Sequence, residues 1–534
     1  MLAAHDPVME TTVETIRDSR PSSDLRGPAT AGWIVVIVLV AGTAFALRLL
    51  PVLVGGGLLG RGNYDDGVYY AAASGFVHGL LPYRDFVLLH PPGIVLALAP
   101  FAALADLVGD PTALAVARVG FMLLGAANAV LVAVVLRRFG PVAALIGGLA
   151  YAVFFPAVYV EHTVLLEPLA TSCLLGAVLL VTSAPTTDPP PANIHAESGP
   201  STHLLRPMVI AGALLGLATA IKVWGIVPAA AVIIWALVAL GLRRALAVAA
   251  GFAAGATAVC LPFFLAAPQQ MWQQVLLAQL GRPRMGSSWS ERVYEIAGLT
   301  PLDPTSSWWL VGVGVVALLS SLAAWQSREG RLAVLLLGAT VALLFATPSW
   351  FLHYAALSAA PVALVLGAAA GWLGGRLPRP AAIAAVAAAI GLITAYGNLV
   401  LALPFGRSFP TAQLRPAVAA SKTCVTTDDP ISLIELDVLR RNISRHCPLV
   451  VDLGGYNYAL QIGDSRFRSR AKSPRWQTVA LDYLTSGDTA VVGIRFRSGY
   501  GYSTATASAV KSWPVLARAG GVTVRRPLPA DAER

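Results

Sequence analysis

Hydrophobic residues gather in long, uninterrupted runs along most of the chain. Each run is about 17–25 residues long, which is the length of a helix that crosses the hydrocarbon core of a bilayer. No run shows the period-two alternation of a membrane barrel, so the spanning segments are expected to be helices. The runs lie near 31–50, 112–135, 141–158, 164–183, 206–222, 224–241, 245–266, 307–326, 331–347, 351–373 and 380–403.

The composition agrees with this pattern. The chain has 534 residues, of which 56% are hydrophobic and 12% charged, and its mean hydropathy is +0.68. These values indicate a polytopic α-helical membrane protein of about eleven spans, with the lipid bilayer rather than nucleic acid as its partner. The first run follows a polar segment of about thirty residues and shows no obvious small-residue cleavage site, so we expect a retained span that follows a cytoplasmic tail at 1–30.

Basic residues between the runs predict the orientation. With the amino terminus inside, the connections that carry paired arginines all fall on the cytoplasmic side, as the positive-inside rule requires. Counting the apolar stretch 91–107 as a span would reverse this order, so we expect it to lie along the outer surface or to dip into it. The connections in question carry Arg137, Arg138, Arg243, Arg244, Arg328, Arg331, Arg376 and Arg379.

An odd number of spans places the carboxy-terminal part outside the cell. Residues 404–534 contain short β-like runs and glycine turns, which predict a soluble α/β domain. This part holds 18 basic and 10 acidic residues, so it carries eight of the ten net positive charges of the chain. Cys424 and Cys447 lie in it, and an extracytoplasmic pair of cysteines is expected to form a disulfide.

Polar residues can then be sorted by membrane side. The long outer loops are predicted at 53–111 and 267–306, and a cytoplasmic linker at 184–205. Ionisable groups that collect at the outer ends of spans are costly unless they are paired or solvated, which makes them candidates for a functional site. The candidates are Asp65, Asp66, Tyr69, Arg84, Glu161, His162, Glu167, Lys222, Arg282, Arg284, His353 and Tyr354.

The order of several short motifs resembles the GT-C glycosyltransferases, and within them the branch of protein O-mannosyltransferases and aminoarabinose-transferase-like enzymes. The resemblance covers residues 31–403, while 404–534 match no family that we can name. The motifs are YDDGVY at 64–69, GLLPYRDF at 79–86, HPPG at 90–93, Ala117-Arg118, the segment 161–167, Lys222 and FLHY at 351–354 followed by Pro361.

The resemblance implies an inverting transfer from a polyprenyl-phosphate sugar on the extracytoplasmic face of a bacterial plasma membrane. The sugar is mannose or arabinofuranose, and the acceptor is a cell-envelope glycan, a glycolipid or a protein. Asp65 takes the position of the family's catalytic acid residue, with Asp66 as the alternative base. The resemblance implies no required cofactor and leaves a weak dependence on a divalent metal open.

Other residues are candidates for holding the donor. Basic side chains bind phosphate oxygens, which makes Arg84, Lys222, Arg282, Arg284 and His353 candidates for the leaving group. Glu161 and Glu167 are candidates for orienting the sugar or the acceptor, or for pairing with Arg84 and holding the loops together. His162, Tyr69 and Tyr354 are further candidates for substrate binding on the same face.

Two other classes of function stay open at this point. A transporter or flippase of a lipid-linked sugar would place charges near the bilayer midplane, and a non-catalytic scaffold would bind glycan through its outer domain.

Overall fold

The computed structural model describes residues 28–184, 205–283, 287–302, 308–464, 466–496 and 501–528. Most of the predicted tail 1–30, most of the linker 184–205, and Arg284 lie outside the described residues. Within the described ranges, the chain folds into a bundle of long helices followed by a smaller domain with a mixed sheet.

Long apolar helices form the bundle. Many of their outward-facing leucine, isoleucine and valine side chains are exposed, notably on α1, α14 and α17, as expected for surfaces that contact lipid. The helices are α1 Pro28–Gly55, α4 Asp110–Leu136, α5 Pro141–Val153, α6 Phe155–Glu161, α7 Leu166–Ser183, α8 Arg206–Ile221, α9 Ile226–Leu240, α10 Leu242–Ala266, α14 Trp308–Ala324, α15 Arg328–Ala346, α16 Ala359–Gly374 and α17 Arg379–Leu401.

The length of these helices shows a multi-pass membrane protein. Among the described residues, eight helices are long and apolar enough to cross a membrane, and the bent pair α5–α6 makes a ninth. The prediction of about eleven spans differs because the runs at 206–222 and 307–326 form α8 and α14, which are shorter apolar helices of 16 and 17 residues.

Helix α8 still belongs to the bundle, because its glycines pack against α10. A Cβ atom on Gly212 would lie 2.0 Å from the carbonyl oxygen of Val248, and one on Gly255 would lie 2.4 Å from that of Ala213. Small residues that let two backbones approach this closely are typical of helix contacts in membranes.

The predicted span 141–158 is broken. Helices α5 and α6 meet at Phe154 with a bend of 59°. Pro156, in the first turn of α6, has no backbone N–H to continue the hydrogen bonds of α5. The break turns α6 towards the end of the bundle where the outer loops lie.

Short elements cover that end of the bundle. The first outer loop contains strand β1 Gly60–Arg61, helix α2 Tyr64–Val77 and helix α3 Gly93–Val108, which is the stretch predicted to lie along the outer surface. The later outer loop contains α11 Pro268–Met271, a π-helical turn Trp272–Leu277, α12 Ala278–Leu280 and α13 Trp289–Ile296. A 3₁₀ segment, Leu352–Ser358, precedes α16.

The carboxy-terminal domain is built on a four-stranded sheet in the order β3-β4-β6-β5. Strand β3 Val425–Thr427 pairs in parallel with β4 Thr489–Val492, and β4, β6 Val522–Arg525 and β5 Val515–Ala519 pair antiparallel. Its helices are α18 Thr411–Ala419, α19 Pro430–Glu435, α20 Leu439–Ser444, α21 Tyr456–Ala459, α22 Pro474–Thr485 and α23 Thr504–Ser512. The predicted combination of helical membrane part and soluble α/β domain is confirmed.

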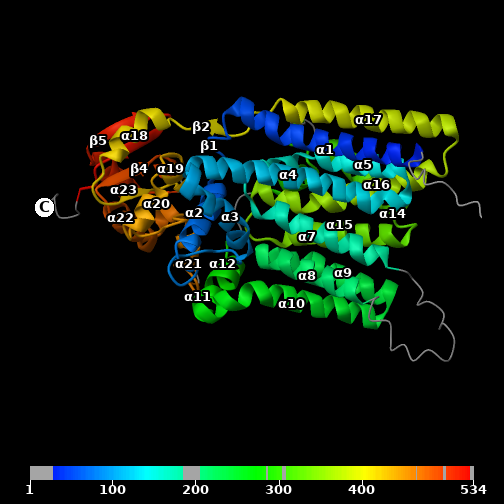
Figure 1. Cartoon of the computed structure of the whole chain (residues 1–534), viewed down its shortest axis with the longest axis horizontal. Coiled ribbons are helices and arrows are strands. Elements are labelled where there is room, and N and C mark those ends of the chain that lie inside the picture. Colours follow the sequence, from blue (N-terminus) through cyan, green and yellow to red (C-terminus); the bar gives the residue numbers. More distant parts are fainter. Residues whose placement is uncertain are drawn as a thin grey trace, which may run out of the picture.

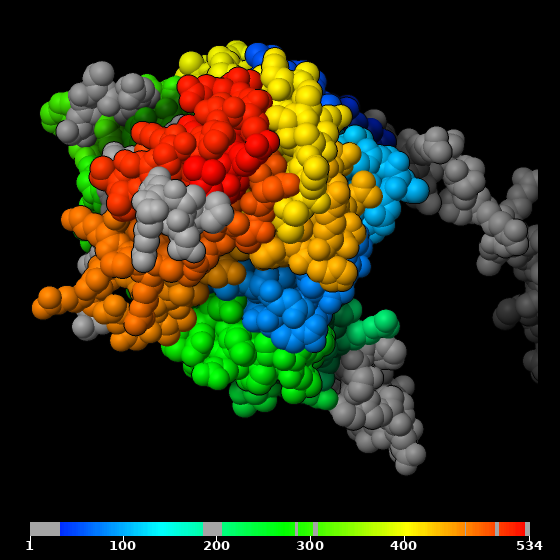
Figure 2. Space-filling model, turned by 90° about the vertical axis from the view of Figure 1, so that its left-hand side faces the viewer, coloured from blue at the N-terminus to red at the C-terminus, as the bar shows by residue number. Residues whose placement is uncertain are grey.

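The domain sits on one end of the bundle (Figure 1). The bundle helices run side by side away from it, and α2 and α3 lie between the two parts. Strand β2 Arg407–Ser408 follows α17 and pairs antiparallel with β1, so a two-stranded ribbon joins the first outer loop to the start of the domain. Viewed end-on, the yellow-to-red residues of the domain cover much of this face, beside the blue and green outer loops (Figure 2).

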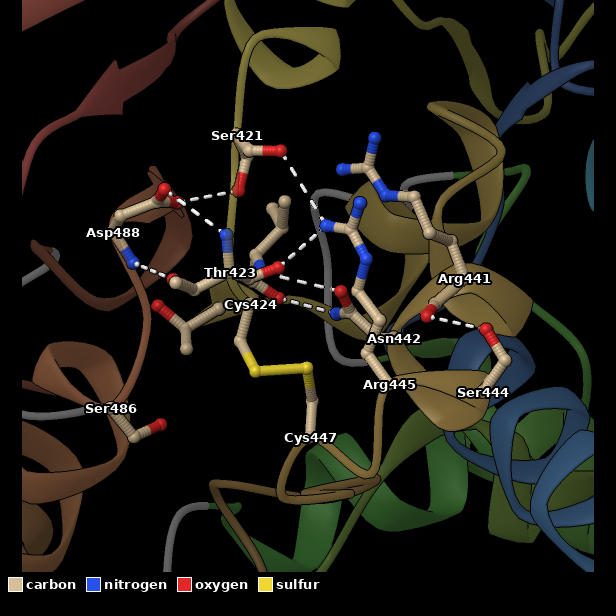
Figure 3. The surroundings of a disulfide bond; sticks show 12 residues. Ser421, Thr423, Cys424, Arg441, Asn442, Ser444, Arg445, Cys447, Ser486 and Asp488 are labelled. Atoms are coloured by element: carbon tan, nitrogen blue, oxygen red, sulfur yellow. Dashed lines mark hydrogen bonds between the residues drawn. A yellow bond between two sulfur atoms is a disulfide. The ribbon is translucent and has the colours of Figure 1, made fainter.

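The predicted disulfide between Cys424 and Cys447 is confirmed. It joins the start of β3 to the segment after α20, across a sequence separation of 23 residues (Figure 3). Asn442 reinforces the same junction, since its amide group accepts from the backbone N–H and donates to the carbonyl of Val425.

Candidate active site

A cavity of about 340 Å³ lies where the outer loops meet the carboxy-terminal domain. Both parts of the chain contribute to its wall, which makes it an interdomain site. Its lining includes Asn63, Tyr64, Asp65, His90, Tyr159, Arg282, Phe351, Leu352, His353, Tyr354, Asp452, Gly455, Tyr458, Arg470, Ile494 and Arg495.

Asp65 enters this cavity from the first turn of α2. The side-chain oxygen of Asn63 caps that helix by accepting from the backbone N–H of Asp65 at 3.1 Å. Burial raises the pKa of Asp65 to about 7, and the negative charges of Asp452 and Glu167 add to the rise. A carboxyl group that titrates near neutral pH is well matched to accept a proton from a hydroxyl group.

Asp66 points elsewhere, because adjacent residues on a helix diverge by about 100°. It is fully buried and forms an ion pair with Arg118 of α4, with 2.8 Å between Arg118 Nε and Asp66 Oδ2. Its other oxygen accepts from the backbone N–H of Val164 at 3.0 Å. The structure therefore corrects the prediction of Asp66 as the alternative base, since its carboxylate holds α2 against α4.

Arginine side chains face Asp65 across the cavity. Arg282, two residues after α12, donates to the hydroxyl of Tyr354 at 3.1 Å and lies 4.6 Å from the ring centre of Tyr458. Arg495, from the carboxy-terminal domain, lies 4.6 Å from the ring centre of Tyr64. Within the described residues, Nε of Arg282 and both Nε and Nη2 of Arg495 are buried without a hydrogen-bond partner. Buried guanidinium donors of this kind are suited to bind an anion.

Lys222 and Glu167 form a buried ion pair beside these arginines. Lys222 follows the last residue of α8, and its ammonium group also lies 4.5 Å from the ring centre of Tyr354. Glu167 already neutralises Lys222, so the lysine is not a free cation for a ligand. Its ammonium group instead packs on Tyr354, and its positive charge partly offsets the rise in the pKa of Asp65. The two residues predicted as separate site candidates thus act as one unit.

His90 lines the cavity, and the buried ring of Tyr69 packs against it. The two rings meet edge to face, with 5.5 Å between their centres. Burial lowers the pKa of His90 well below its usual value, and the positive charges of Arg282 and Lys222 lower it further. His90 is therefore neutral at neutral pH and is available as a hydrogen-bonding group.

Asp452 is a site residue that the sequence did not reveal. Its Oδ1 accepts from the hydroxyl of Tyr64 at 3.1 Å and from the backbone N–H of Gly455 at 2.7 Å. It follows the apolar run Leu449-Val450-Val451, and such an acidic residue after a β-like run was the only local signal. Arg470 and Arg495 carried no signal at all, because arginines are frequent throughout this domain.

Two arginines that were predicted to bind the donor phosphate are not among the described residues that line the cavity. The side chain of Arg84 is 52% exposed and pairs with its neighbour Asp85 at 2.8 Å, so it does not reach the site. Arg284 lies outside the described residues.

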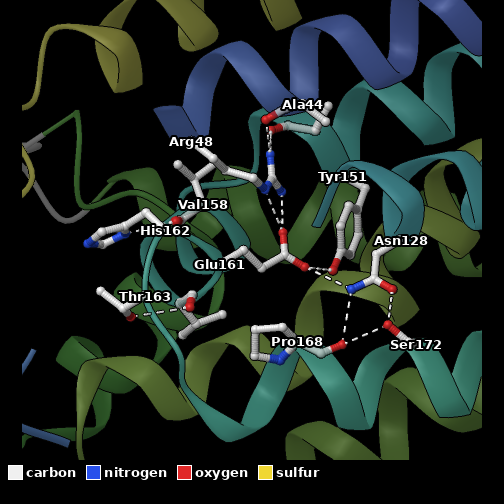
Figure 4. Close-up of polar contacts among 12 residues, drawn as sticks. Ala44, Arg48, Asn128, Tyr151, Val158, Glu161, His162, Thr163, Pro168 and Ser172 are labelled. Atoms are coloured by element: carbon white, nitrogen blue, oxygen red, sulfur yellow. Dashed lines mark hydrogen bonds and ion pairs between the residues drawn. The ribbon is translucent and has the colours of Figure 1, made fainter. Parts of the chain in front are cut away.

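Glu161 is also placed elsewhere, inside the helix bundle (Figure 4). Its carboxylate pairs with Arg48 of α1 and accepts hydrogen bonds from Tyr151 at 2.7 Å and from Asn128 at 2.9 Å. The prediction that Glu161 orients sugar or acceptor is not supported, because every one of these partners ties α6 to α1, α4 and α5. Two buried charges are tolerable here only because each is paired and hydrogen-bonded.

His162 lies beside a second and larger cavity, of about 660 Å³. Its ring stacks on Phe405 with 4.3 Å between the centres. The two cavities share Asn63, Tyr64, Tyr159 and Ile494, so these residues form the partition between them.

Among the described residues, no three or more histidine, cysteine, aspartate or glutamate side chains are grouped so that they could hold a metal ion.

Comparison with known proteins links this architecture to sugar-transferring membrane enzymes. Residues 88–348 match the model of glycosyltransferase family 87. No curated protein matches the chain.

Solved structures share the fold over most of the chain. ArnT from Cupriavidus metallidurans, bound to undecaprenyl phosphate, is 17% identical with a TM-score of 0.57, over 94% of this chain and 99% of that one. The Archaeoglobus fulgidus oligosaccharyltransferase AglB, in complex with an inhibitory peptide and a dolichol-phosphate, is 14% identical with a TM-score of 0.54, over 88% and 70%. At these identities the likeness shows the fold.

Proposed function

We propose that this chain, whose fold is the predicted GT-C fold of membrane glycosyltransferases, transfers a sugar from a polyprenyl-phosphate donor to a hydroxyl group of an acceptor. The sugar is mannose or arabinofuranose, and the acceptor belongs to the cell envelope. One observation carries this proposal. Asp65, whose pKa is about 7, and arginines with buried N–H donors that have no partner among the described residues line the same cavity at the end of the helix bundle.

The chemistry follows from these groups. Asp65 removes the proton from the acceptor hydroxyl while its oxygen attacks the anomeric carbon of the donor sugar. The bond between that carbon and the phosphate oxygen breaks on the opposite side, so a single displacement inverts the configuration at the anomeric carbon. The electron pair leaves with the lipid phosphate, which gains one negative charge.

Arginines stabilise this leaving group. Arg282 and Arg495 offer their buried donors, and Arg470 lines the same wall. Because a guanidinium group binds phosphate oxygens with two parallel hydrogen bonds, the site favours the charge that develops as the bond breaks. We further propose that transfer requires no divalent cation, since these side chains supply the positive charge.

A lipid tail needs an apolar surface, and one lies nearby. A largely apolar groove of about 570 Å³ runs between α5, α13, α14, α15, α16 and α17. It includes Ile296, and this residue belongs to the apolar cluster that also contains Tyr354 of the site. Two of the similar structures contain polyprenyl or dolichyl phosphates, which supports a lipid donor here.

The positive-inside pattern supports an orientation in which the site and the carboxy-terminal domain face away from the cytoplasm. We propose a bacterial plasma membrane as the location, where cell-wall glycans are extended on the outer side.

The test is transfer of radiolabelled sugar by the purified full chain, supplied in turn with polyprenyl-phosphate mannose and polyprenyl-phosphate arabinose. Wild-type transfer from one donor that is lost in Asp65→Asn and retained in Asp482→Asn, at equal protein level, would support the proposal. Asp482 is an exposed aspartate on α22, so its substitution controls for the chemical change alone. Absence of transfer from either donor would refute the proposal.

A further inference from the structure

The larger cavity, of about 660 Å³, has a wall unlike that of the arginine-rich cavity. It lies next to the β1–β2 ribbon and is bounded by the first outer loop, the segment after α17 and the carboxy-terminal domain. Its volume falls within the range of about 300–1,000 Å³ that is usual for small-ligand sites. The residues that line it include Arg61, Asn63, Tyr64, Tyr159, His162, Phe405, Arg407, Asp429 and Ile431.

Its position relative to Asp65 is informative. Asn63 and Tyr64 line both cavities, and Asp65 is the next residue in the chain. Asn63 Nδ2 also contacts the hydroxyl of Tyr159 at 3.4 Å, and Tyr159 lines both cavities too, so the two cavities meet at these shared residues. Asp65 itself lines only the smaller cavity, so a molecule in the larger cavity that extends past the shared residues would present a group to Asp65 while the sugar donor occupies the smaller one.

The polar pair Arg61 and Asp429 shows what kind of group the cavity suits. Arg61 Nε and Asp429 Oδ2 are 4.0 Å apart, which is too far for a direct hydrogen bond. Within the described residues Arg61 Nε has no hydrogen-bond partner, although the atom is buried. A hydroxyl oxygen beside the pair, about 2.8 Å from each of the two atoms, would accept from Arg61 and donate to Asp429, because a hydroxyl group is both donor and acceptor.

Aromatic and planar side chains complete this wall. His162 and Phe405 line the cavity and stack with 4.3 Å between ring centres, and the guanidinium of Arg61 lies 5.3 Å from the ring centre of Phe409, which is buried behind the wall. Flat aromatic faces beside hydroxyl-binding polar groups suit the alternating apolar and hydroxylated surfaces of a sugar ring. The cavity thus has the chemistry of a saccharide site rather than that of a prenyl or acyl chain.

We propose that this larger cavity binds the acceptor, that the acceptor is the hydroxylated end of a glycan, and that Asp429 and Arg61 bind one of its hydroxyl groups. This inference rests on the proposed transferase function and adds the class of acceptor to it. It also gives the carboxy-terminal domain a direct role, since Asp429 belongs to that domain and is 5% exposed.

Asp429→Asn is a suitable variant because it preserves the local fold. Asp429 caps α19, with 3.2 Å between its Oδ1 and the backbone N–H of Ile431. Asparagine caps helices about as well as aspartate, so the substitution removes the negative charge at Oδ2 while the cap stays. Arg61→Gln removes the other half of the pair, and Asp482→Asn serves as the matched control on the same domain.

The experiment measures KM for both substrates with the purified full chain. The acceptor probes are octyl mannoside, octyl arabinofuranoside and a peptide rich in serine and threonine. With the better alkyl glycoside, we expect Asp429→Asn and Arg61→Gln to raise the acceptor KM about tenfold, as for loss of a hydrogen bond to a charged group. The donor KM should change less than twofold, and Asp482→Asn should leave both values unchanged.

Three results would overturn the inference. The acceptor KM could stay unchanged in both variants, both KM values could rise together, or the wild type could use the peptide and neither glycoside. In each case transfer still occurs, so the proposed function survives and only the assignment of the cavity fails. If the wild type transfers to none of the probes and does not release sugar from the donor, the proposed function and this inference fail together.

Discussion

Asp65 leads to a prediction in which activity and stability change in opposite directions. Burial raises its pKa from 3.8 to about 7, so the folded protein favours the neutral carboxyl group. At about 1.36 kcal/mol for each pKa unit, this preference corresponds to at most about 4 kcal/mol. A base needs the ionised form, so we expect catalysis to require a state that the fold disfavours.

The sign of the pH effect follows from this shift. A carboxyl group whose pKa is raised in the folded state binds a proton more tightly there than in the unfolded chain. Its favourable contribution is complete below pH 3.8 and is lost as the pH rises through about 7. Transfer should show the reverse trend, rising with pH to a plateau with a midpoint near 7, because only ionised Asp65 accepts the proton.

Asp65→Asn should separate the two properties. Removal of a general base typically costs about 10²–10⁴-fold in rate, so transfer should fall by that factor on the plateau above pH 7 and by less at lower pH, where Asp65 of the wild type is already protonated. The melting temperature of the variant should exceed that of the wild type at pH 8, and the difference should vanish at pH 4. We would measure both with the full chain in detergent, with Asp482→Asn as control.

Three results would refute this reasoning. A transfer rate that does not vary between pH 5 and 9 would show that no group near pH 7 limits the reaction. A variant that keeps wild-type activity would show that another residue accepts the proton. A loss of activity together with a lower melting temperature at pH 8 would indicate that Asp65 is structural.

Three further predictions concern residues outside the catalytic chemistry. Arg118→Gln leaves Asp66 buried without its partner, so it should destabilise the protein by about 3–5 kcal/mol, measured by denaturant or thermal unfolding; a change below 1 kcal/mol would contradict the buried ion pair. Arg84→Gln should change the transfer rate less than twofold, because the side chain is exposed and does not line the cavity; a tenfold loss would show that Arg84 binds the donor phosphate after all. Replacing Cys424 and Cys447 by serine should destabilise the carboxy-terminal domain by about 3 kcal/mol, as expected for a loop of this length; limited proteolysis with and without a reductant should show the same loss, and equal digestion of both forms would argue against it.

Local sequence was informative about Asp65. The residue lies in the first turn of a helix with an asparagine cap, and both features depend on neighbouring residues. Local sequence could not separate Asp65 from Asp66, because that choice depends on which way α2 faces. The rotation of α2 against α4 buries Asp66 on Arg118 and leaves Asp65 at the cavity.

Residues distant in the chain account for what the sequence did not reveal. Glu161 appeared as a site candidate because it lies near the end of an apolar run, yet its partner Arg48 is 113 residues away. Tyr64 and Asp452 are 388 residues apart and meet only after the carboxy-terminal domain packs on the outer loops. Hydropathy carries no information about such contacts.

The sequence by itself determined the helical membrane class, the soluble domain, the disulfide pair and the resemblance to the GT-C fold, which the structural comparisons confirm. Each of these follows from local properties: run length, composition and short motifs. Only the tertiary structure decided which charged side chains form ion pairs within the fold and which are available to bind a ligand. That distinction depends on pairing across the chain, because a buried charge must find its partner wherever the packing places one.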